Sequence, residues 1–318
     1  MKDSLVSVIS PCYNKAFSLD KFIRSIIDQD YRPIELIIVD DGSTDSSWDI
    51  LQSMKSECNQ TGILTIFLHQ ANQGVSGAIN TALTRVNGEF LCWPDCDDWL
   101  DSTSIRKRVQ FLQENNRFDI VTSNAFVFKE NDLTHPIGMI ATDDCRFREQ
   151  QFNLMLNGKS IVCPGCHMVR TEALFTSMGG NQIFPSRYGQ NLQLLLPILY
   201  HSPRGFIDEP LYNYVNYIGS LSHYQRTFER VWAHREGRYQ IKLETINHIS
   251  GMKDKERKKA LRTVSVNEAR YRLQIAKEFK KKEIAKRQLF WLFKLRALSP
   301  ADILVWFSTM AKVLTDNK

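Results

Sequence analysis

The sequence contains no hydrophobic run long enough to cross a membrane as a helix. Its longest mainly apolar stretches are Leu192–Tyr200 and Ile303–Leu314, whereas a spanning helix needs about 20 apolar residues. The N-terminus carries the acidic residue Asp3, and the apolar run Leu5–Ile9 that follows is too short for the core of a signal peptide. We therefore expect a cytoplasmic protein without a membrane span or an export signal.

Cysteine, glycine and proline are sparse. The seven cysteines are an odd number in a chain without an export signal, which favours buried thiols over a disulfide framework. The 15 glycines and 10 prolines form no repeat and no low-complexity linker, which excludes collagen-like and wholly disordered chains. With 318 residues, of which 43% are hydrophobic and 24% charged, the chain suits about two globular domains.

Basic residues are concentrated in the last third of the chain. Residues 224–318 hold 23 Lys/Arg and 10 Asp/Glu, whereas residues 1–223 hold 18 basic and 25 acidic residues. A basic segment of this kind implies an anionic partner. No nucleic-acid recognition motif accompanies the charge, so we expect no nucleic-acid partner.

The basic segment also contains a cluster of aromatic residues. Lys277–Arg287 is followed by Leu289–Phe293, which reads LFWLF. This combination fits a helix that lies on an anionic membrane surface. The alternative is a solvated helical bundle whose aromatic side chains pack on the catalytic body.

The first 125 residues alternate strand and helix patterns. Runs typical of buried strands occur at Val6–Ser10, Leu36–Val39, Ile63–Leu68, Phe90–Trp93 and Asp119–Ser123. This alternation predicts an α/β fold with a parallel sheet and helices on both faces. Since ligands of such sheets bind beyond the carboxyl ends of the strands, the polar residues that follow the strands form the candidate site.

The remaining residues follow two further patterns. Residues 126–223 indicate mixed strands, loops and one helix near Asn191–Leu199, and helices follow from residue 224. One apolar stripe at helical spacing comprises Val266, Ala269, Leu273, Ala276 and Phe279. Ser299 followed by Pro300 predicts a helix start, with serine as the cap and proline at the first position.

Three carboxylates follow the fourth predicted strand, in the segment Asp95-Cys96-Asp97-Asp98. They repel one another unless a cation or solvent intervenes, and hard divalent cations prefer oxygen ligands completed by substrate phosphates. A cation held by these carboxylates would supply the positive charge that a nucleotide diphosphate leaving group needs. The alternative is an acidic helix start, since Asp near a helix N-terminus is favourable.

Three earlier segments give this motif a context. They are Val6–Lys15 (VSVISPCYNK), Glu35–Asp45 (ELIIVDDGSTD) and Asn72–Asn80 (NQGVSGAIN). Together with the acidic motif, in this order and spacing, they closely resemble the family 2 glycosyltransferases. The resemblance is specific over roughly residues 5–125, weaker to residue 223 and absent from the tail.

The resemblance implies a GT-A fold, with a nucleotide-sugar-binding half (1–125), an acceptor-binding half (126–223) and here a basic α-helical tail (224–318). It implies metal-assisted transfer, with inversion, of a hexose or N-acetylhexosamine from a nucleotide-diphosphate-sugar. The expected metal is Mn²⁺ or Mg²⁺. The base is expected to be uracil, with guanine and thymine left open. The acceptor would be a glycan or a lipid-linked glycan in cell-surface polysaccharide or glycoconjugate synthesis, with the enzyme peripheral on the inner face of the membrane.

The resemblance also assigns the nucleobase contacts. Pro11, Tyr13 and Asn14 match the loop that packs on the base in the family. Asp41 matches the carboxylate that reads the base edge, and Asp40 lies beside it.

The remaining donor contacts follow from the later segments. Asn72 and Gly74 match residues beside the nucleoside, although Gly74 is equally explained by helix entry and close packing. Asp95 and Asp97 match the DxD motif, which contacts the ribose and holds the metal on the diphosphate. Asp98 is a candidate for either task.

The chain departs from the family where the catalytic base is expected. The family carries a Glu-Asp pair near a helix start in the acceptor half, and Gln190-Asn191 occupy the matching position here. An amide cannot usefully accept the acceptor's proton. The acceptor could already be ionised, another residue could supply the base, or the enzyme could be a degenerate module that binds a sugar nucleotide without transferring it. His167 is a candidate substitute base, and a hydrogen-bonded structural histidine is the alternative.

A second departure concerns the closing of the diphosphate site. Val215 and Tyr217 stand where family members often have Arg and His, and His223 is a candidate to compensate. The family's Gln-x-x-Arg-Trp pattern of processive polymerases is missing, which favours single-sugar addition. A nucleotidyltransferase is a rival of another class, but no Gly-rich basic loop that could hold a triphosphate follows the first strand. The segment Cys163–His167 lacks the two further ligands that a zinc site would need.

Overall fold

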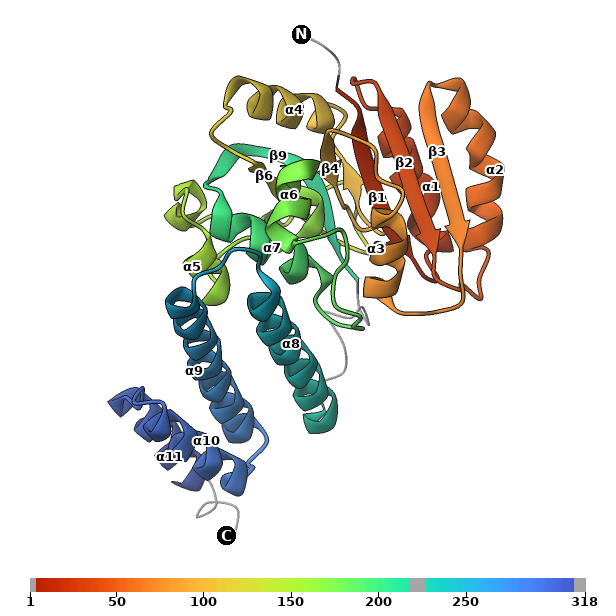
Figure 1. The fold of residues 1–318 in the computed structure, drawn as a ribbon. Helices are drawn as coiled ribbons and strands as arrows, with labels where there is room; N and C mark the ends of the chain where they lie inside the picture. Colours follow the sequence, from red (N-terminus) through yellow and green to blue (C-terminus); the bar gives the residue numbers. More distant parts are fainter. Residues whose placement is uncertain (1–3, 218–226, 312–318) are drawn as a thin grey trace. The chain divides into compact units, whose positions relative to one another are not determined.

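The computed structural model describes residues 4–217 and 227–311 (Figure 1). Contacts divide the chain into two compact units, one of Met1–Tyr224 with His248–Gly251 and the other of Gln225–Asn247 with Met252–Lys318. Within the described ranges, each helix is either too short or too polar to cross a bilayer. His223, a candidate for the diphosphate site, lies outside the described residues.

The first half of the sheet is parallel, as predicted. It contains β1 (Val6–Cys12), β2 (Ile34–Asp40), β3 (Ile63–His69) and β4 (Phe90–Cys92), in the order β3-β2-β1-β4. The helices between them are α1 (Ala16–Ile27), α2 (Ser47–Gln60) and α3 (Val75–Leu83).

Helices cover both faces of these strands, and so the strands are apolar throughout. In β2, Leu36 and Ile38 join a core shared with α1 and α2. Ile37 and Val39 alternate with them and are equally buried, on the face where α3 contacts β1 and β2. Because these strands are parallel, the polar residues that follow them lie at one edge of the sheet.

The second half of the sheet is mixed. It adds β5 (Trp99–Leu100), β6 (Ile120–Lys129), β7 (Gly138–Met139), β8 (His167–Arg170) and β9 (Arg204–Asn216). The predicted fifth strand is β6, but it does not adjoin β4, because the four-residue β8 lies antiparallel between them. β9 runs parallel to β6 and antiparallel to β5.

Four further α-helices and two short 3₁₀ helices lie in the described part of this unit. They are α4 (Ser104–Glu114), η1 (Asp144–Phe147), α5 (Phe152–Leu156), η2 (Pro164–Cys166), α6 (Thr171–Met178) and α7 (Gln190–His201). The helix predicted near Asn191–Leu199 is confirmed as α7. All seven cysteines are unpaired thiols; five of them are buried, as expected, whereas Cys145 and Cys163 are partly exposed.

The second unit is helical. Its elements are α8 (Phe228–His248), α9 (Asp254–Glu278), α10 (Lys282–Lys294) and α11 (Pro300–Ala311). Four residues of the predicted stripe, from Val266 to Ala276, form a core with Ala285 and Leu292 of α10. Phe279 instead follows the last residue of α9 as its C-cap and packs edge-on against Phe228, with ring centres 5.8 Å apart.

The start of α11 follows the predicted capping pattern. Pro300 is its first residue, and the Ser299 hydroxyl lies 2.7 Å from Asp302 Oδ2. The Ser299 backbone N–H also donates to Asp302 Oδ2, at 2.9 Å. In return, the Asp302 backbone N–H donates to Ser299 Oγ at 3.4 Å, so the pattern is that of a capping box with Asp in the place of Glu.

Candidate active site

The acidic segment after β4 forms the only cluster of three or more His, Cys, Asp or Glu side chains suited to a metal ion in the part of the chain that the structure describes. One carboxylate oxygen from each of Asp95, Asp97 and Asp98 lies within 4.8 Å of the others. Asp95 and Asp97 are partly exposed, whereas Asp98 is buried. This oxygen-only set is the kind that hard divalent cations prefer.

Asp98 is occupied in holding β9 against the acidic segment. Its Oδ2 accepts a hydrogen bond from the Tyr212 hydroxyl at 2.7 Å, and its Oδ1 accepts one from the Val215 backbone N–H at 2.8 Å. Burial, followed by the neighbouring charges of Asp97 and Asp95, raises the pKa of Asp98 well above its usual range. Asp95 and Asp97 are therefore the two partly exposed carboxylates of the cluster that a ligand could reach.

Asp95 is destabilised as an anion. Burial, and then the charge of Asp97, raises its pKa to about 7, although Lys15 partly opposes the shift. A divalent cation would remove this penalty by neutralising both carboxylates. The donor set thus fits a cation by its chemistry as well as by its geometry.

Lys15 is a charged residue of the site that the sequence analysis missed. Its Nζ lies 2.5 Å from Asp97 Oδ2, and its backbone N–H donates to Ser47 Oγ at 2.9 Å. Burial alone would lower the pKa of Lys15, but Asp97 raises it above the usual value. The available signal was a basic residue directly after the Tyr13-Asn14 pair at the carboxyl end of β1.

The loops after β1 and β2 are tied together. Asn14 has a positive φ of 52°, and its Oδ1 accepts a hydrogen bond from the Thr44 backbone N–H at 2.8 Å. Its own backbone N–H donates to Ser43 Oγ at 2.9 Å. The Tyr13 side chain beside it is 46% exposed, so its ring is accessible to a flat ligand. The Pro11 carbonyl, near the end of β1, accepts a hydrogen bond from the Cys96 thiol at 3.2 Å. This bond joins the loop to the acidic segment.

The adjacent aspartates at the end of β2 have different surroundings. Asp41 Oδ1 accepts hydrogen bonds from the Gln73 backbone N–H at 2.9 Å and from Gln70 Nε2 at 2.7 Å, which braces the loop after β3. Asp40 Oδ2 lies 2.6 Å from His69 Nδ1, whereas its buried Oδ1 has no hydrogen-bond partner among the described residues. His69 was missed because the predicted third strand stops one residue earlier.

Asn72 and Gly74 lie where the loop after β3 enters α3. Asn72 is exposed, and Gly74 precedes the first residue of α3 with a φ of 79°. A Cβ atom on Gly74 would stand 3.1 Å from the Arg187 side chain. Close packing thus explains this glycine, and its predicted contact with a nucleoside stays a prediction.

The segment before α7 lies against α3. The Asn80 side chain donates to the Ile183 carbonyl at 2.9 Å and accepts from the Ile183 backbone N–H at 2.7 Å. These bonds link the second half of the unit to the first. Gln190 and Asn191 are the first two residues of α7, and both are partly buried. The Asn191 Oδ1 is buried without a hydrogen-bond partner among the described residues.

Val215 and Tyr217 both contact the acidic segment. Val215 does so through its backbone N–H, and the Tyr217 hydroxyl donates to the Asp97 carbonyl at 3.2 Å. The Tyr217 ring also packs edge-on against Phe17, with ring centres 5.1 Å apart. The end of β9 thus lies over the acidic cluster without a basic side chain at either of these two positions.

His167 is a buried residue of the sheet. Its side chain is 2% exposed, Nδ1 lies 2.9 Å from Thr122 Oγ1, and its ring stacks on Trp93 with centres 5.9 Å apart. Burial, with smaller contributions from Arg204 and Arg108, lowers its pKa to about 3. These contacts support the structural interpretation of His167, and its role as a substitute base stays a prediction.

The neutral state of His167 predicts a pH-dependent stability. Between its folded pKa of about 3 and its ordinary value of 6.5, the unfolded chain binds more protons than the folded protein. Stability contributed by His167 is therefore full above pH 6.5 and is lost as the pH falls, by up to about 1.4 kcal/mol per pH unit. We expect the difference in free energy of unfolding between the unaltered protein and His167→Gln to shrink from pH 7 to pH 5 in urea titrations. A difference that stays constant over this range would contradict the buried neutral histidine.

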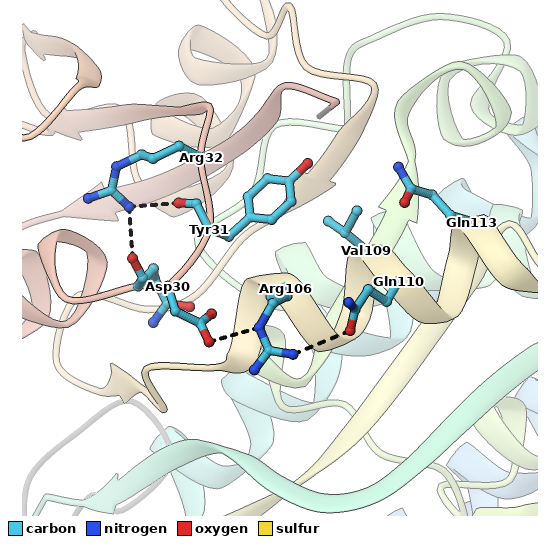
Figure 2. Close-up of a pocket in the computed structure, with 8 residues that line it drawn as sticks. Asp30, Tyr31, Arg32, Arg106, Val109, Gln110 and Gln113 are labelled. Atoms are coloured by element: carbon cyan, nitrogen blue, oxygen red, sulfur yellow. Dashed lines mark hydrogen bonds and ion pairs between the residues drawn. The ribbon is translucent and has the colours of Figure 1, made fainter. Parts of the chain in front are cut away.

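A surface pocket of about 420 Å³ lies away from this site (Figure 2). It is lined by residues 29–32, which precede the amino end of β2, and by α4. Its cations are already paired. Arg106 Nε donates to Asp30 Oδ2 at 2.8 Å, and Arg32 Nη1 donates to the Tyr31 carbonyl at 2.7 Å. The candidate site is at the carboxyl ends of the strands and does not include this pocket.

Comparison with known proteins gives a family and several relatives. The model of "Glycosyl transferase family 2" matches residues 7–175. Glycosyltransferase GlyG of Streptococcus pneumoniae is 27% identical over 238 residues, which cover 72% of this chain and 76% of GlyG. The Escherichia coli glucosyltransferase WfaP is 30% identical over 167 residues, which cover 52% of this chain and 61% of WfaP. Glycosyltransferase GlyA of S. pneumoniae is 33% identical over 130 residues, which cover 41% of this chain but only 18% of GlyA.

Solved structures share the fold over nearly the whole chain. TarS 1–349 of S. aureus, in complex with UDP-GlcNAc, superimposes with a TM-score of 0.64 at 16% identity and covers 98% of this chain and 92% of its own. The mannosyltransferase PcManGT of Pyrobaculum calidifontis, in complex with GDP-Man and Mn²⁺, does so with a TM-score of 0.52 at 17% identity. The matched region covers 99% of this chain and 88% of the PcManGT chain.

Proposed function

The chain belongs to glycosyl transferase family 2 and has the GT-A fold, and we propose that it moves a single sugar from a nucleotide-diphosphate-sugar to a glycan or lipid-linked acceptor with inversion. The observation that carries this proposal is the cluster of Asp95, Asp97 and Asp98 at the carboxyl edge of the sheet. Ligands of open α/β sheets bind at this edge.

Asp95 and Asp97 are the proposed ligands of Mn²⁺ or Mg²⁺. Both are partly exposed, and the raised pKa of Asp95, caused by burial and then by the charge of Asp97, supports a cation between them. When bound, the cation would neutralise the diphosphate leaving group. The fold shared with PcManGT, which was solved with Mn²⁺, supports a divalent cation here.

Lys15 supplies positive charge from the chain itself. Its ammonium group touches Asp97, so it lies where the leaving diphosphate would approach the acidic cluster. Such a group can pair with phosphate oxygens as charge develops on them. We therefore propose that Lys15 binds the diphosphate. It would take the role of the Arg and His that family members often have at the positions of Val215 and Tyr217.

The loops after β1, β2 and β3 are the proposed nucleoside site. Pro11, Tyr13 and Asn14 would pack on the base, with Asp41 at its edge and Asp40 beside it. Asn72 and Gly74 would flank the nucleoside. The exposed Tyr13 ring and the shared fold with TarS, solved with UDP-GlcNAc, support a UDP-linked donor.

The acceptor is proposed to be a glycan on a lipid carrier in cell-surface polysaccharide synthesis. WfaP carries the name of a glucosyltransferase acting on a GlcNAc-diphosphoundecaprenol, and this supports a lipid-linked acceptor here. Its hydroxyl would attack the anomeric carbon from the face opposite the diphosphate, beside the start of α7, as the bond from that carbon to the diphosphate breaks. The hydroxyl proton would pass to a base other than the amides Gln190 and Asn191. With such an acceptor, the enzyme would work at the cytoplasmic face of the membrane. We propose that the basic tail (224–318) contacts that surface.

Thermal melting against a panel of nucleotide diphosphates and sugar nucleotides, with and without Mn²⁺, tests the donor site. A ligand at about 100 times its Kd adds roughly 2.7 kcal/mol of stability, which raises Tm by several degrees in a chain of this size. We expect a metal-dependent rise with uridine nucleotides. The absence of a rise across the whole panel would contradict the donor site.

A degenerate sugar-nucleotide-binding module is the second candidate, and Gln190-Asn191 at the start of α7 favour it. Both candidates predict donor binding, so a transfer assay separates them. Transfer by the unaltered protein supports the enzyme. Donor binding without transfer, with transfer gained by Asn191→Asp, supports the module.

A further inference from the structure

Two helices of the second unit present large apolar side chains to solvent. The exposed side chains are Phe290, Trp291 and Phe293 of α10 and Ile303, Leu304 and Phe307 of α11. The fractions exposed range from 38% for Ile303 to 68% for Leu304. We call these six residues the apolar face. On each helix they lie on the exposed side at adjacent or helical spacings, and exposed apolar surface of this kind marks interaction sites.

These six side chains are not required by the core of their own unit. The core between α9, α10 and α11 is filled by other residues, including Leu273, Ala285 and Leu292, with Leu289 and Trp306 packed against it. The apolar face therefore lies on the sides of α10 and α11 that point away from this core. In Figure 1 the two helices lie next to each other at the end of the chain.

On α10 the aromatic residues alternate with basic ones. Lys286, Arg287 and Lys294 are exposed on the same side of the helix as Phe290 and Phe293. The Lys294 ammonium lies 4.7 Å from the centre of the Phe290 ring. No ion pair to any of these three cations is found among the described residues, so their charge is available to an external anion.

On α11 the exposed side carries no charge. Residues 303–311 contain no Asp, Glu, Lys or Arg. A nucleic acid would find no cation on this helix, and an acidic protein would pair only with α10. A lipid bilayer combines an apolar interior with anionic headgroups at its surface, which matches both helices together.

We propose that the apolar face of α10 and α11 lies in the interface of an anionic lipid bilayer, with Lys286, Arg287 and Lys294 on the headgroups. A second copy of this chain is a poorer occupant. In a two-fold interface the same patch meets itself, so the basic residues of the two α10 helices would repel one another. The inference deepens the proposed function and rests on it, because it assigns the surface that would meet a lipid-borne acceptor.

Flotation of the full-length protein with lipid vesicles tests the proposal. We expect binding to vesicles of phosphatidylglycerol and phosphatidylcholine, weaker binding to phosphatidylcholine alone, and a loss of affinity as salt is raised. The apolar variant Phe290→Ser/Phe293→Ser/Leu304→Ser/Phe307→Ser should bind both vesicle types at least about tenfold more weakly. The basic variant Lys286→Gln/Arg287→Gln/Lys294→Gln should lose most of the preference for anionic vesicles and its salt dependence.

Matched controls come from the first unit. Leu64 is 55% exposed on β3, and Lys55 is exposed on α2. Leu64→Ser and Lys55→Gln should leave vesicle binding unchanged. Circular dichroism and Tm should show that all the variants remain folded, since every altered side chain is exposed.

Two results would overturn the proposal. One is vesicle binding that the apolar and basic variants retain in full. The other is no vesicle binding, with self-association in light scattering that the apolar variant abolishes, which would assign the face to a second copy. The donor-induced rise in Tm needs no lipid, so it separates a failure of this proposal from a failure of the donor site.

Discussion

Replacing Asp97 with alanine is expected to reduce sugar transfer by at least about 10³-fold. Asp97 is a proposed metal ligand, lies among the carboxylates of the acidic cluster, and is the partner of Lys15 at 2.5 Å. Its loss would remove a ligand from the cation and would release Lys15 from its position. Because Asp97 is partly exposed, the fold should persist and Tm should change little. Single-turnover transfer, measured with a labelled donor over a range of Mn²⁺ concentrations, is the test.

A matched substitution separates this effect from a general loss of charge. Asp144 is fully exposed, and its Oδ1 lies 3.8 Å from Arg146 Nη1. An exposed ion pair of this length contributes little to stability. Asp144→Asn should therefore transfer sugar at the unaltered rate. Unimpaired transfer by Asp97→Ala, with the metal response retained, would contradict the assignment of Asp97 as a metal ligand.

Replacing Gly165 with alanine is expected to destabilise the protein by about 3 kcal/mol, which lowers Tm by roughly 6 °C. A Cβ atom at this position would stand 2.0 Å from the Tyr212 ring. The ring cannot move aside freely, because it is fully buried and its hydroxyl donates to Asp98. Displacing Tyr212 would also free Asp98, so metal-dependent donor binding should weaken in the same variant. Thermal unfolding with and without donor and Mn²⁺ measures both effects.

Gly138 supplies the control for this substitution. A Cβ atom there would meet no atom within 4 Å, so Gly138→Ala should keep Tm within about 1 °C. Gly165→Ala with an unchanged Tm would show that Tyr212 is not held in place. The acidic cluster would then not depend on β9 in the way that the two Asp98 hydrogen bonds indicate.

The sequence by itself determined the elements whose signals are local. Leu36–Val39 is apolar on both faces, and this identified a strand covered on both sides without knowledge of its neighbours. Ser299 and Pro300 identified the start of α11, because a cap depends on a few consecutive residues. The segments around Tyr13, Asp41 and Asp97 identified the family, since each combines a strand end with polar residues at a fixed spacing.

Only the tertiary structure decided which distant residues meet. The antiparallel β8 lies between β4 and β6, although its four residues carry too short a pattern to predict a strand or its partners. Lys15 reaches Asp97 across 82 residues of sequence, and Asp98 is committed to Tyr212, 114 residues away. Aromatic residues at helical spacing fit either a core or a surface, and their exposure on α10 was decided by the residues that fill the α9–α11 core. A local sequence pattern reflects the backbone conformation of a residue and its near neighbours. Contacts, burial and charge pairing instead depend on which residues far apart in the sequence the fold brings together.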